Sequence, residues 1–330
     1  MLMTKAVIQN DDCCGAGTGY TGPAEELSTS EADLDALFEK VCNWGRWGDD
    51  DERGTLNHIG PDEVAHAATL VTVGRTVSMS RGFPTVPSIE NPRPAQHYMV
   101  VTGEDRQAPH IAGMECTSDY IGLAFHGLAC SHIDALCHTF HRGRMYNGRP
   151  ASDVKSRGAV ANTIMAIKDG IVGRGVLLDM PRALGVDFIE PSHLVTSGEL
   201  EIAERELGVT LRKGDILAVR MGRDVRPGRG DGRMAGLHPF VAGWLHDRNV
   251  AVICGDGPND ANPAGVLSAW PYPVHDLCVA GMGIPLVDNL YLEGVAATCA
   301  ELNRWAFQIV IAPLLIEGGT GSPVNPIAIF

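Results

Sequence analysis

Apolar residues near the start of the chain recur at the spacing of an amphipathic helix. Leu34, Leu37, Phe38 and Val41 follow Ser30 at intervals that place them on one helical face. A serine directly before such a run is a typical helix N-cap. We therefore predict that the first helix begins near Ser30.

Short apolar runs of strand length recur further along the chain and alternate with helical patterns. The runs occupy residues 175–180, 215–220, 250–254 and 309–316. Helices are predicted over residues 61–71, where Pro61 stands in the first turn, and over residues 197–207 and 240–247. Strands that alternate with helices are typical of the α/β class, which we predict for this chain.

The first 30 residues differ from the rest of the chain. They are rich in Gly, Thr and Ser, show no periodicity and include the vicinal pair Cys13 and Cys14. We predict a flexible N-terminal arm over residues 1–30. Residues 31–330 contain no internal repeat of about 20–50 residues and no evident linker, so we predict that they form a single domain.

Charge and cysteine usage narrow the function classes. The 330 residues carry a formal net charge of -14 and no long basic run, which disfavours nucleic acid as a partner. No apolar run approaches the roughly 18–20 residues that span a bilayer, and residues 1–12 lack the pattern of a signal peptide. The nine cysteines are scattered without a CxxC pair, which fits reduced thiols. We expect a cytoplasmic protein that acts on a small molecule.

The first candidate for chemistry is the pair His132 and Asp134. Residues 123–134 lack a helical period and can be read as one extended segment. Residues two apart on a strand share a face, so the imidazole and the carboxylate would project together. This pair is half of a site for Zn or Mn. A buried His bonded to a neighbouring Asp is the structural alternative.

Two further histidines follow within nine residues of His132. The turn over residues 135–137 could bring His138 back over the site, where a neutral imidazole can transfer protons as general acid and base. No comparable argument exists for His141, which we expect to be solvated.

Three other positions are weaker candidates for ligand contacts. Trp44 and Trp47 lie in a polar, Gly-bearing loop, where they could contact a ligand or simply cover the core. His238 stands at an apparent helix N-terminus, where it could reach a substrate or cap the helix at the surface. The Gly-rich residues 318–323 lack the Lys of a phosphate-binding loop and are interpreted as a turn.

Residues 128–138 resemble the signature H-x-G-T-H-x-D-x-P-x-H of the cyclase-like metal hydrolases, which include bacterial kynurenine formamidase and isatin hydrolase. The match covers Ser131, His132, Asp134 and His138, and the sequence departs from the signature at Leu128, Cys130 and Leu136. Segments at residues 175–179, 213–217 and 318–323 also resemble the family, in family order. The resemblance covers most of residues 44–330.

The resemblance implies a single α/β domain with a mixed, barrel-like sheet and flanking helices, assembled as a homo-oligomer, either a dimer or a tetramer. It implies that His275 and Asp288, an Asp where the family has Glu, join His132 and Asp134 as metal ligands. It also implies that Trp47 contacts substrate. The implied reaction is hydrolysis of a C–N or C–O bond in a small amide, cyclic amide or lactone, with metal-activated water and with His138 as general acid and base.

Leu128 bears on the number of metal ions. The family has a His there that helps to hold one metal of a two-metal centre, and Leu has no donor atom. We therefore expect one divalent ion, Zn or Mn. His126 lies two residues earlier, which on a strand is about 6–7 Å, too far for direct substitution unless the strand bulges. Cys130 is the nearer spare donor.

Two other functions remain open at this stage. A non-haem Fe(II) oxygenase also uses two His and one carboxylate, although such sites commonly lie on all-β folds rather than α/β folds. A non-catalytic binding protein on the same fold is the second alternative, because the first signature His is missing. Metal-dependent turnover would exclude the latter.

Overall fold

The computed structural model describes residues 18–21, 29–105, 112–191, 193–263 and 267–330. Its main feature is a nine-stranded mixed sheet that curls into a half-barrel. The strand order is β16 (Gly321–Pro323), β5 (His132–Asp134), β14 (Leu286–Asp288), β13 (Val252–Gly255), β11 (Ile216–Arg220), β8 (Ile171–Asp179), β15 (Ala306–Ile311), β17 (Ile327–Ile329) and β2 (Thr76–Ser78). The four strands from β14 to β8 are parallel, and the pairs on either side of them are antiparallel.

The apolar runs of the sequence form the centre of this sheet. Strands β8, β11 and β13 include most residues of three predicted runs, and the strand residues are buried nearly throughout. Parallel strands covered on both faces need continuous apolar sequence, which explains why these runs do not alternate with polar residues. The fourth predicted run, residues 309–316, is a strand only in part. Strand β15 stops at Ile311, and Leu314 and Leu315 beyond it are exposed.

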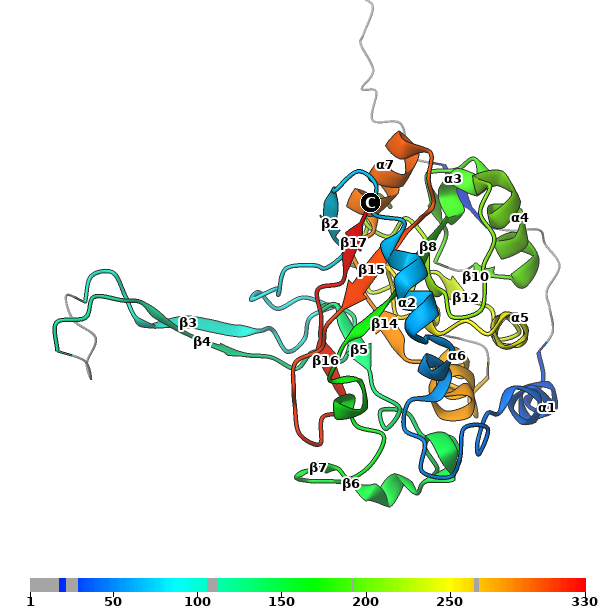
Figure 1. Ribbon diagram of the computed structural model, residues 1–330, viewed down its shortest axis with the longest axis horizontal. Helices are drawn as coiled ribbons and strands as arrows, with labels where there is room; N and C mark the ends of the chain where they lie inside the picture. The colour runs from blue at the N-terminus through cyan, green and yellow to red at the C-terminus, as the bar shows by residue number, and fades with distance from the viewer. Residues whose placement is uncertain (1–17, 22–28, 106–111, 192, 264–266) are drawn as a thin grey trace, which may run out of the picture.

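The predicted helices are confirmed, with small differences at their ends. Helix α1 (Glu31–Val41) begins after Ser30, whose side chain forms a capping box with Asp33. The others are α2 (Pro61–Ala68), α4 (Ser197–Leu207) and α5 (Val241–Arg248). Helix α2 lies across β8 and β15, as Figure 1 shows, and α4 also packs on β8. The predicted α/β fold with flanking helices is confirmed.

The remaining elements are short. The helices are η1 (Gly54–His58), η2 (Tyr146–Gly148), η3 (Ala151–Asp153), η4 (Ile164–Ile167), α3 (Met180–Leu184), α6 (Pro273–His275), the π-helix η5 (Asp276–Met282) and α7 (Glu293–Leu302). The strands outside the main sheet form four pairs: β1 (Gly19–Tyr20) with β9 (Phe188–Ile189), β3 (Gln96–Val101) with β4 (Ser118–Gly122), β6 (Val154–Lys155) with β7 (Gly158–Ala159), and β10 (Leu194–Val195) with β12 (Gly236–Leu237).

The β3–β4 ribbon projects away from the rest of the molecule (Figure 1). Tyr98 and Tyr120 stack on one face of the ribbon with ring centroids 4.9 Å apart. On the other face, Met99 and Ile121 lie beside an ion pair between His97 and Asp119. All these side chains are exposed, so the ribbon presents apolar groups on both faces.

Most of the predicted flexible arm, including Cys13 and Cys14, lies outside the described residues. Within the arm, Gly19–Tyr20 forms β1, which pairs in parallel with β9, and Thr18 donates two hydrogen bonds to Asp187. Among the described residues, no helix has both the length and the apolar character needed to cross a membrane.

Candidate metal centre

Two neighbouring strands bring together three of the predicted metal ligands. Strands β5 and β14 are antiparallel, and Asp288 lies directly opposite His132. His132 and Asp134 are two residues apart on β5 and therefore share its face, as the sequence predicted. All three side chains are buried. The structure thus places one imidazole and two carboxylates on one patch of the sheet.

His275 reaches this patch from the helical segment formed by α6 and η5. Its Nε2 lies 3.5 Å from Asp134 Oδ2 and 3.6 Å from Asp288 Oδ2. Burial alone would lower the pKa of His275, but Asp134, Asp260 and Asp288 outweigh it and raise that pKa well above its usual value. The fourth predicted ligand is therefore in place.

Asp260 and Asn259 orient these ligands, and sequence reasoning missed both. Asp260 lies 2.7 Å from His275 Nδ1 and accepts backbone hydrogen bonds from Val274 and His275. Asn259 donates to Asp288 Oδ1 at 2.6 Å. Both residues follow the carboxyl end of the parallel strand β13, where α/β proteins commonly bind ligands. That placement is the signal that could have found them.

His132 is oriented by the backbone. Its Nδ1 lies 2.9 Å from the carbonyl oxygen of Cys130, so the Nδ1 proton is donated there and Nε2 keeps its lone pair. This Nε2 faces Asp134 Oδ1 at 3.5 Å. The tautomer suited to metal ligation is thus selected by a main-chain contact.

The carboxylate of Asp134 is the centre of the cluster. It is completely buried, yet neither oxygen accepts a hydrogen bond from the described residues. Burial opposes ionisation, but His138, His126 and His132 outweigh it and hold the pKa of Asp134 well below its usual value. A buried carboxylate without hydrogen bonds is costly unless a cation compensates it.

The spacing of the donor atoms fits such a cation. Two donors that each lie about 2.0–2.1 Å from one tetrahedral ion are about 3.4 Å apart. The separations of Asp134 from His132 and His275 are both 3.5 Å, and that of His275 from Asp288 is 3.6 Å. These side chains approach one another as ligands of a shared ion do, without direct hydrogen bonds.

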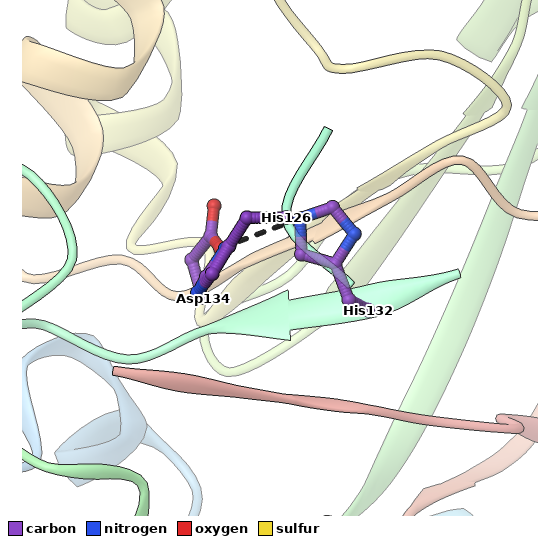
Figure 2. A group of neighbouring side chains, drawn as sticks. All are labelled: His126, His132 and Asp134. Carbon is purple, nitrogen blue, oxygen red and sulfur yellow. Dashed lines mark ion pairs between the residues drawn. The ribbon is translucent and has the colours of Figure 1, made fainter. Parts of the chain in front are cut away.

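His126 also belongs to the cluster, and the expectation that it lies too far away is wrong. Its Nδ1 lies 3.0 Å from Asp134 Oδ1. Figure 2 shows its ring gathered with His132 and Asp134 over β5. Two groups of three potential ligands result, which share Asp134: His126, His132 and Asp134, and Asp134, His275 and Asp288.

The physical reason is that residues 123–134 are not one extended segment. Only His132–Asp134 form a strand, and Gly127 adopts a φ of 135°, which L side chains rarely adopt. Asn289 donates to the carbonyl oxygen of Gly127 and Arg223 to that of Leu128, each at 2.7 Å. Side chains from distant parts of the chain therefore replace the strand partner that an extended segment would need.

His138 lies beside the cluster as predicted. Its Nε2 is 3.9 Å from Asp134 Oδ1, and its ring stacks on that of His126 with centroids 3.9 Å apart. Burial is the largest cause that lowers the pKa of His138, to about 4, although Asp134 acts in the opposite direction. The imidazole is thus neutral near pH 7 and able to accept a proton.

The thiol of Cys130, considered as a spare donor, belongs to neither group of potential ligands, and Cys130 contributes its carbonyl oxygen instead. One expectation for this region is wrong. His141 is not solvated: it stacks on Phe38 at 4.1 Å and lies 3.6 Å from Asp276. The side chain therefore packs against residues of α1 and η5 instead of facing the solvent.

The structure does not bring the predicted substrate contacts to the cluster. Trp47 packs edge-on against His58 at 5.2 Å, with the guanidinium of Arg46 over its ring. Trp44 donates to the carbonyl oxygen of Ala280. His238 is buried, and its Nδ1 accepts a hydrogen bond from the backbone N–H of Phe240, just before α5 begins. None of the three lines the pocket described next.

A pocket of about 330 Å³ opens onto the cluster. His132, Asp134, His138, His275 and Asp288 line its floor. Phe140 and Tyr272 also line it and are partly exposed to solvent, at 38% and 47%. The volume suits a small organic molecule.

The fold and sequence identify the family. The sequence profile of the Cyclase family matches residues 66–260, more than half of the chain. A crystal structure described as a novel cyclase is 31% identical, with a TM-score of 0.81 over 89% of this chain and 99% of that one. The chain belongs to the cyclase family. This confirms the resemblance noted in the sequence.

Other solved structures with this fold are more distant in sequence. Isatin hydrolase A from Labrenzia aggregata, solved with benzyl benzoate, is 22% identical with a TM-score of 0.55 over 80% of this chain and 96% of its own. An isatin hydrolase bound to the product analogue thioisatinate is 19% identical with a TM-score of 0.56, over 82% and 98%. These similarities establish a shared fold. No curated protein matches the chain.

Proposed function

We propose that this member of the cyclase family is a metal-dependent hydrolase that cleaves a C–N or C–O bond in a small amide, cyclic amide or lactone. The observation that carries the proposal is the buried Asp134 carboxylate, on which imidazole nitrogens of His126, His132 and His275 converge at 3.0, 3.5 and 3.5 Å. A site of this kind at the floor of a pocket supports a metal-assisted reaction on a small substrate.

The donor set is suited to a divalent ion, Zn or Mn. His132, Asp134, His275 and Asp288 would hold it through imidazole nitrogens and carboxylate oxygens. When bound, such an ion polarises a substrate carbonyl and lowers the pKa of coordinated water towards neutrality. Asp260 and the Cys130 carbonyl would keep the two imidazoles oriented for this task.

His138 is the proposed general acid and base. It lines the pocket, and its lowered pKa keeps the imidazole neutral at pH 7. The ring is held in place by its stacking on His126. A neutral imidazole beside the reacting groups can take a proton from water and return it to the leaving atom.

Phe140 and Tyr272, rather than Trp47 and His238, are the proposed substrate contacts. Both aromatic residues line the same pocket as the cluster, and flat aromatic faces favour planar substrates. The two isatin hydrolases that share the fold support hydrolysis as the reaction class.

A hydrolysis screen tests the proposal. N-formylkynurenine, isatin-type lactams, cyclic imides and lactones would be incubated with the protein, with and without a chelator. We expect turnover of at least one compound that chelation abolishes and added Zn or Mn restores. Oxygen uptake with a 2-oxoacid would instead identify an Fe(II) oxygenase, and metal binding without any turnover would favour a binding protein.

Asp260→Asn tests the orientation of His275. The substitution removes the charge and one accepting oxygen behind the His275 ring. We expect metal affinity to fall by about 10- to 100-fold, as is usual when such an outer partner is lost. Competition with a chromophoric chelator measures the affinity. Asp276→Asn is the matched control, because Asp276 adjoins His275 but pairs with His141; equal losses in both variants would contradict the assigned role.

We also propose a cytoplasmic homo-oligomer. The seven cysteines in the described part of the chain are free, as in a reducing compartment. An isolated two-stranded ribbon is marginally stable in water, and the β3–β4 ribbon exposes apolar groups on both faces. Contact with a second copy of the chain would cover these groups, in line with the oligomers that the resemblance implies.

The double substitution Tyr98→Ser and Ile121→Ser, one on each face of the ribbon, tests this assembly. We expect the oligomer to dissociate into monomers because the substitution removes the apolar surface that would be buried, and light scattering after size-exclusion chromatography measures the mass. Leu315→Ser removes an equally exposed apolar side chain elsewhere and should leave the mass unchanged. An unaltered oligomer in the double variant would contradict the proposal.

A further inference from the structure

We propose that Asp276 is a specificity-determining residue: its carboxylate accepts a hydrogen bond from an N–H group of the substrate, so that the pocket selects amides and cyclic amides over lactones. The inference rests on the proposed metal-dependent hydrolysis and narrows it, because that proposal leaves C–N and C–O bonds equally open. Asp276 is neither a proposed metal ligand nor the proposed proton-transfer group.

Asp276 brings a further negative charge to the pocket. Among the described residues that line the pocket, it is the one carboxylate outside both groups of potential metal ligands. Its side chain is 16% exposed, whereas those of Asp134 and Asp288 are 0% and 3% exposed. The Asp276 carboxylate is therefore more open to a bound molecule than either carboxylate on the sheet.

The accepting capacity of this carboxylate is unused within the described part of the chain. The ion pair that it forms there is with His141, whose Nδ1 lies 3.6 Å from Oδ2, too far for a hydrogen bond. No described residue donates a hydrogen bond to either oxygen. A carboxylate can only accept, and it is stabilised when a donor reaches it. A substrate N–H would supply the donor that these residues do not.

The backbone holds Asp276 in place beside the metal centre. Asp276 follows His275 directly and starts the π-helix η5, whose other residues are buried. Its N–H donates to the carbonyl oxygen of Tyr272 at 3.1 Å, and the N–H groups of Val274 and His275 donate to Asp260. One anchored segment thus carries both a proposed metal ligand and the open carboxylate, so that a small substrate in the pocket can contact both.

The chemistry of an accepting group decides which substrates this contact favours. A lactone has a ring oxygen where the corresponding cyclic amide has an N–H group. That oxygen facing Asp276 would bring two acceptors together with no proton between them, which is repulsive. A site that hydrogen-bonds an N–H group rejects analogues that lack it, because its own polar group is then desolvated without a partner. Attraction of the amide and rejection of the lactone act in the same direction.

Two benzo-fused rings of the same size test the inference. Isoindolin-1-one is a lactam, and phthalide is the lactone with the same ring skeleton, so the pair differs only in N–H against oxygen. Binding of each compound to zinc-loaded, full-length protein would be measured by isothermal titration calorimetry at pH 7, which needs no turnover. We expect the wild type to bind the lactam about 10- to 100-fold more tightly, the range given by one hydrogen bond to a charged group.

Substitutions of Asp276 should remove this preference without removing the metal. Asp276→Ala should bind the two compounds with nearly equal affinity, because the acceptor is gone. Asp276→Asn keeps an accepting oxygen without the charge, so its preference should lie between those of the wild type and Asp276→Ala. Both variants should keep their metal, because Asp276 belongs to neither group of potential ligands. Asp169→Asn removes the same charge from an exposed position outside the pocket and should keep the full preference.

The outcomes separate this inference from the proposed function, with metal analysis and circular dichroism on every variant. An unchanged lactam preference in folded, metal-loaded Asp276→Ala would overturn the role of Asp276. Equal or undetectable binding of the two compounds by the wild type would do the same, and metal-dependent turnover of any compound in the screen would then leave the proposed function standing. A lactam preference that depends on Asp276, in a protein that hydrolyses nothing, would support the recognition and overturn the hydrolysis.

Discussion

Asp134→Asn is expected to lose bound metal and hydrolytic activity together. Asp134 is the only residue common to both groups of potential ligands, and the amide keeps its shape but not its negative charge. Loss of an outer partner of a metal ligand already weakens binding by about 10- to 100-fold, so loss of a ligand common to both groups should exceed that range. Metal analysis after dialysis and the rate on the best substrate of the screen measure the two effects.

Asp276→Asn is the matched control for this prediction. Asp276 lines the same pocket but belongs to neither group of ligands, so its variant should keep its metal. Full metal occupancy in folded Asp134→Asn would refute the assignment of the centre.

His138→Ala is expected to keep its metal and to lose roughly 10²- to 10⁴-fold in kcat, the usual contribution of general acid–base catalysis. The side chain belongs to neither ligand group, and its Nε2 is 3.9 Å from Asp134, farther than the nitrogens of the other three histidines. Steady-state kinetics and metal analysis on the same preparation measure both quantities.

His141→Ala, three residues further along, should retain nearly full kcat because His141 packs on Phe38 away from the pocket floor. If the metal content of His138→Ala falls in step with its rate, His138 is a ligand and another group must transfer the proton.

The elements predicted with most success are those whose signals are local. Ser30 and Asp33 form the capping box that starts α1, and both residues lie within one turn of each other. The pairing of His132 with Asp134 on one face follows from the two-residue period of a strand, which holds even for the short strand β5. In both cases the deciding contacts connect residues a few positions apart.

His126 could not be placed correctly from the sequence. Its distance from Asp134 depends on the turn at Gly127, and that turn is stabilised by Arg223 and Asn289, which lie just after strands β11 and β14. The segment has no helical period, which favours an extended strand. The predicted separation of His126 from Asp134 assumed the length per residue of such a strand, and the chain turns at Gly127 instead. Asp260 was missed for the same reason, since its partner His275 is 15 residues away.

By itself, the sequence determined the α/β class, the capped helices, the apolar runs that form strands and the His132 and Asp134 half-site, because helix and strand periods and caps act over a few residues. The sequence also placed His138 beside the half-site, and the family resemblance added His275 and Asp288. Only the tertiary structure decided that His126 joins the centre, that Asp260 orients His275, and that Trp47 and His238 lie away from the pocket. Those positions depend on which distant segments the sheet brings side by side, and hydrogen bonds between such segments leave no periodic pattern in the chain.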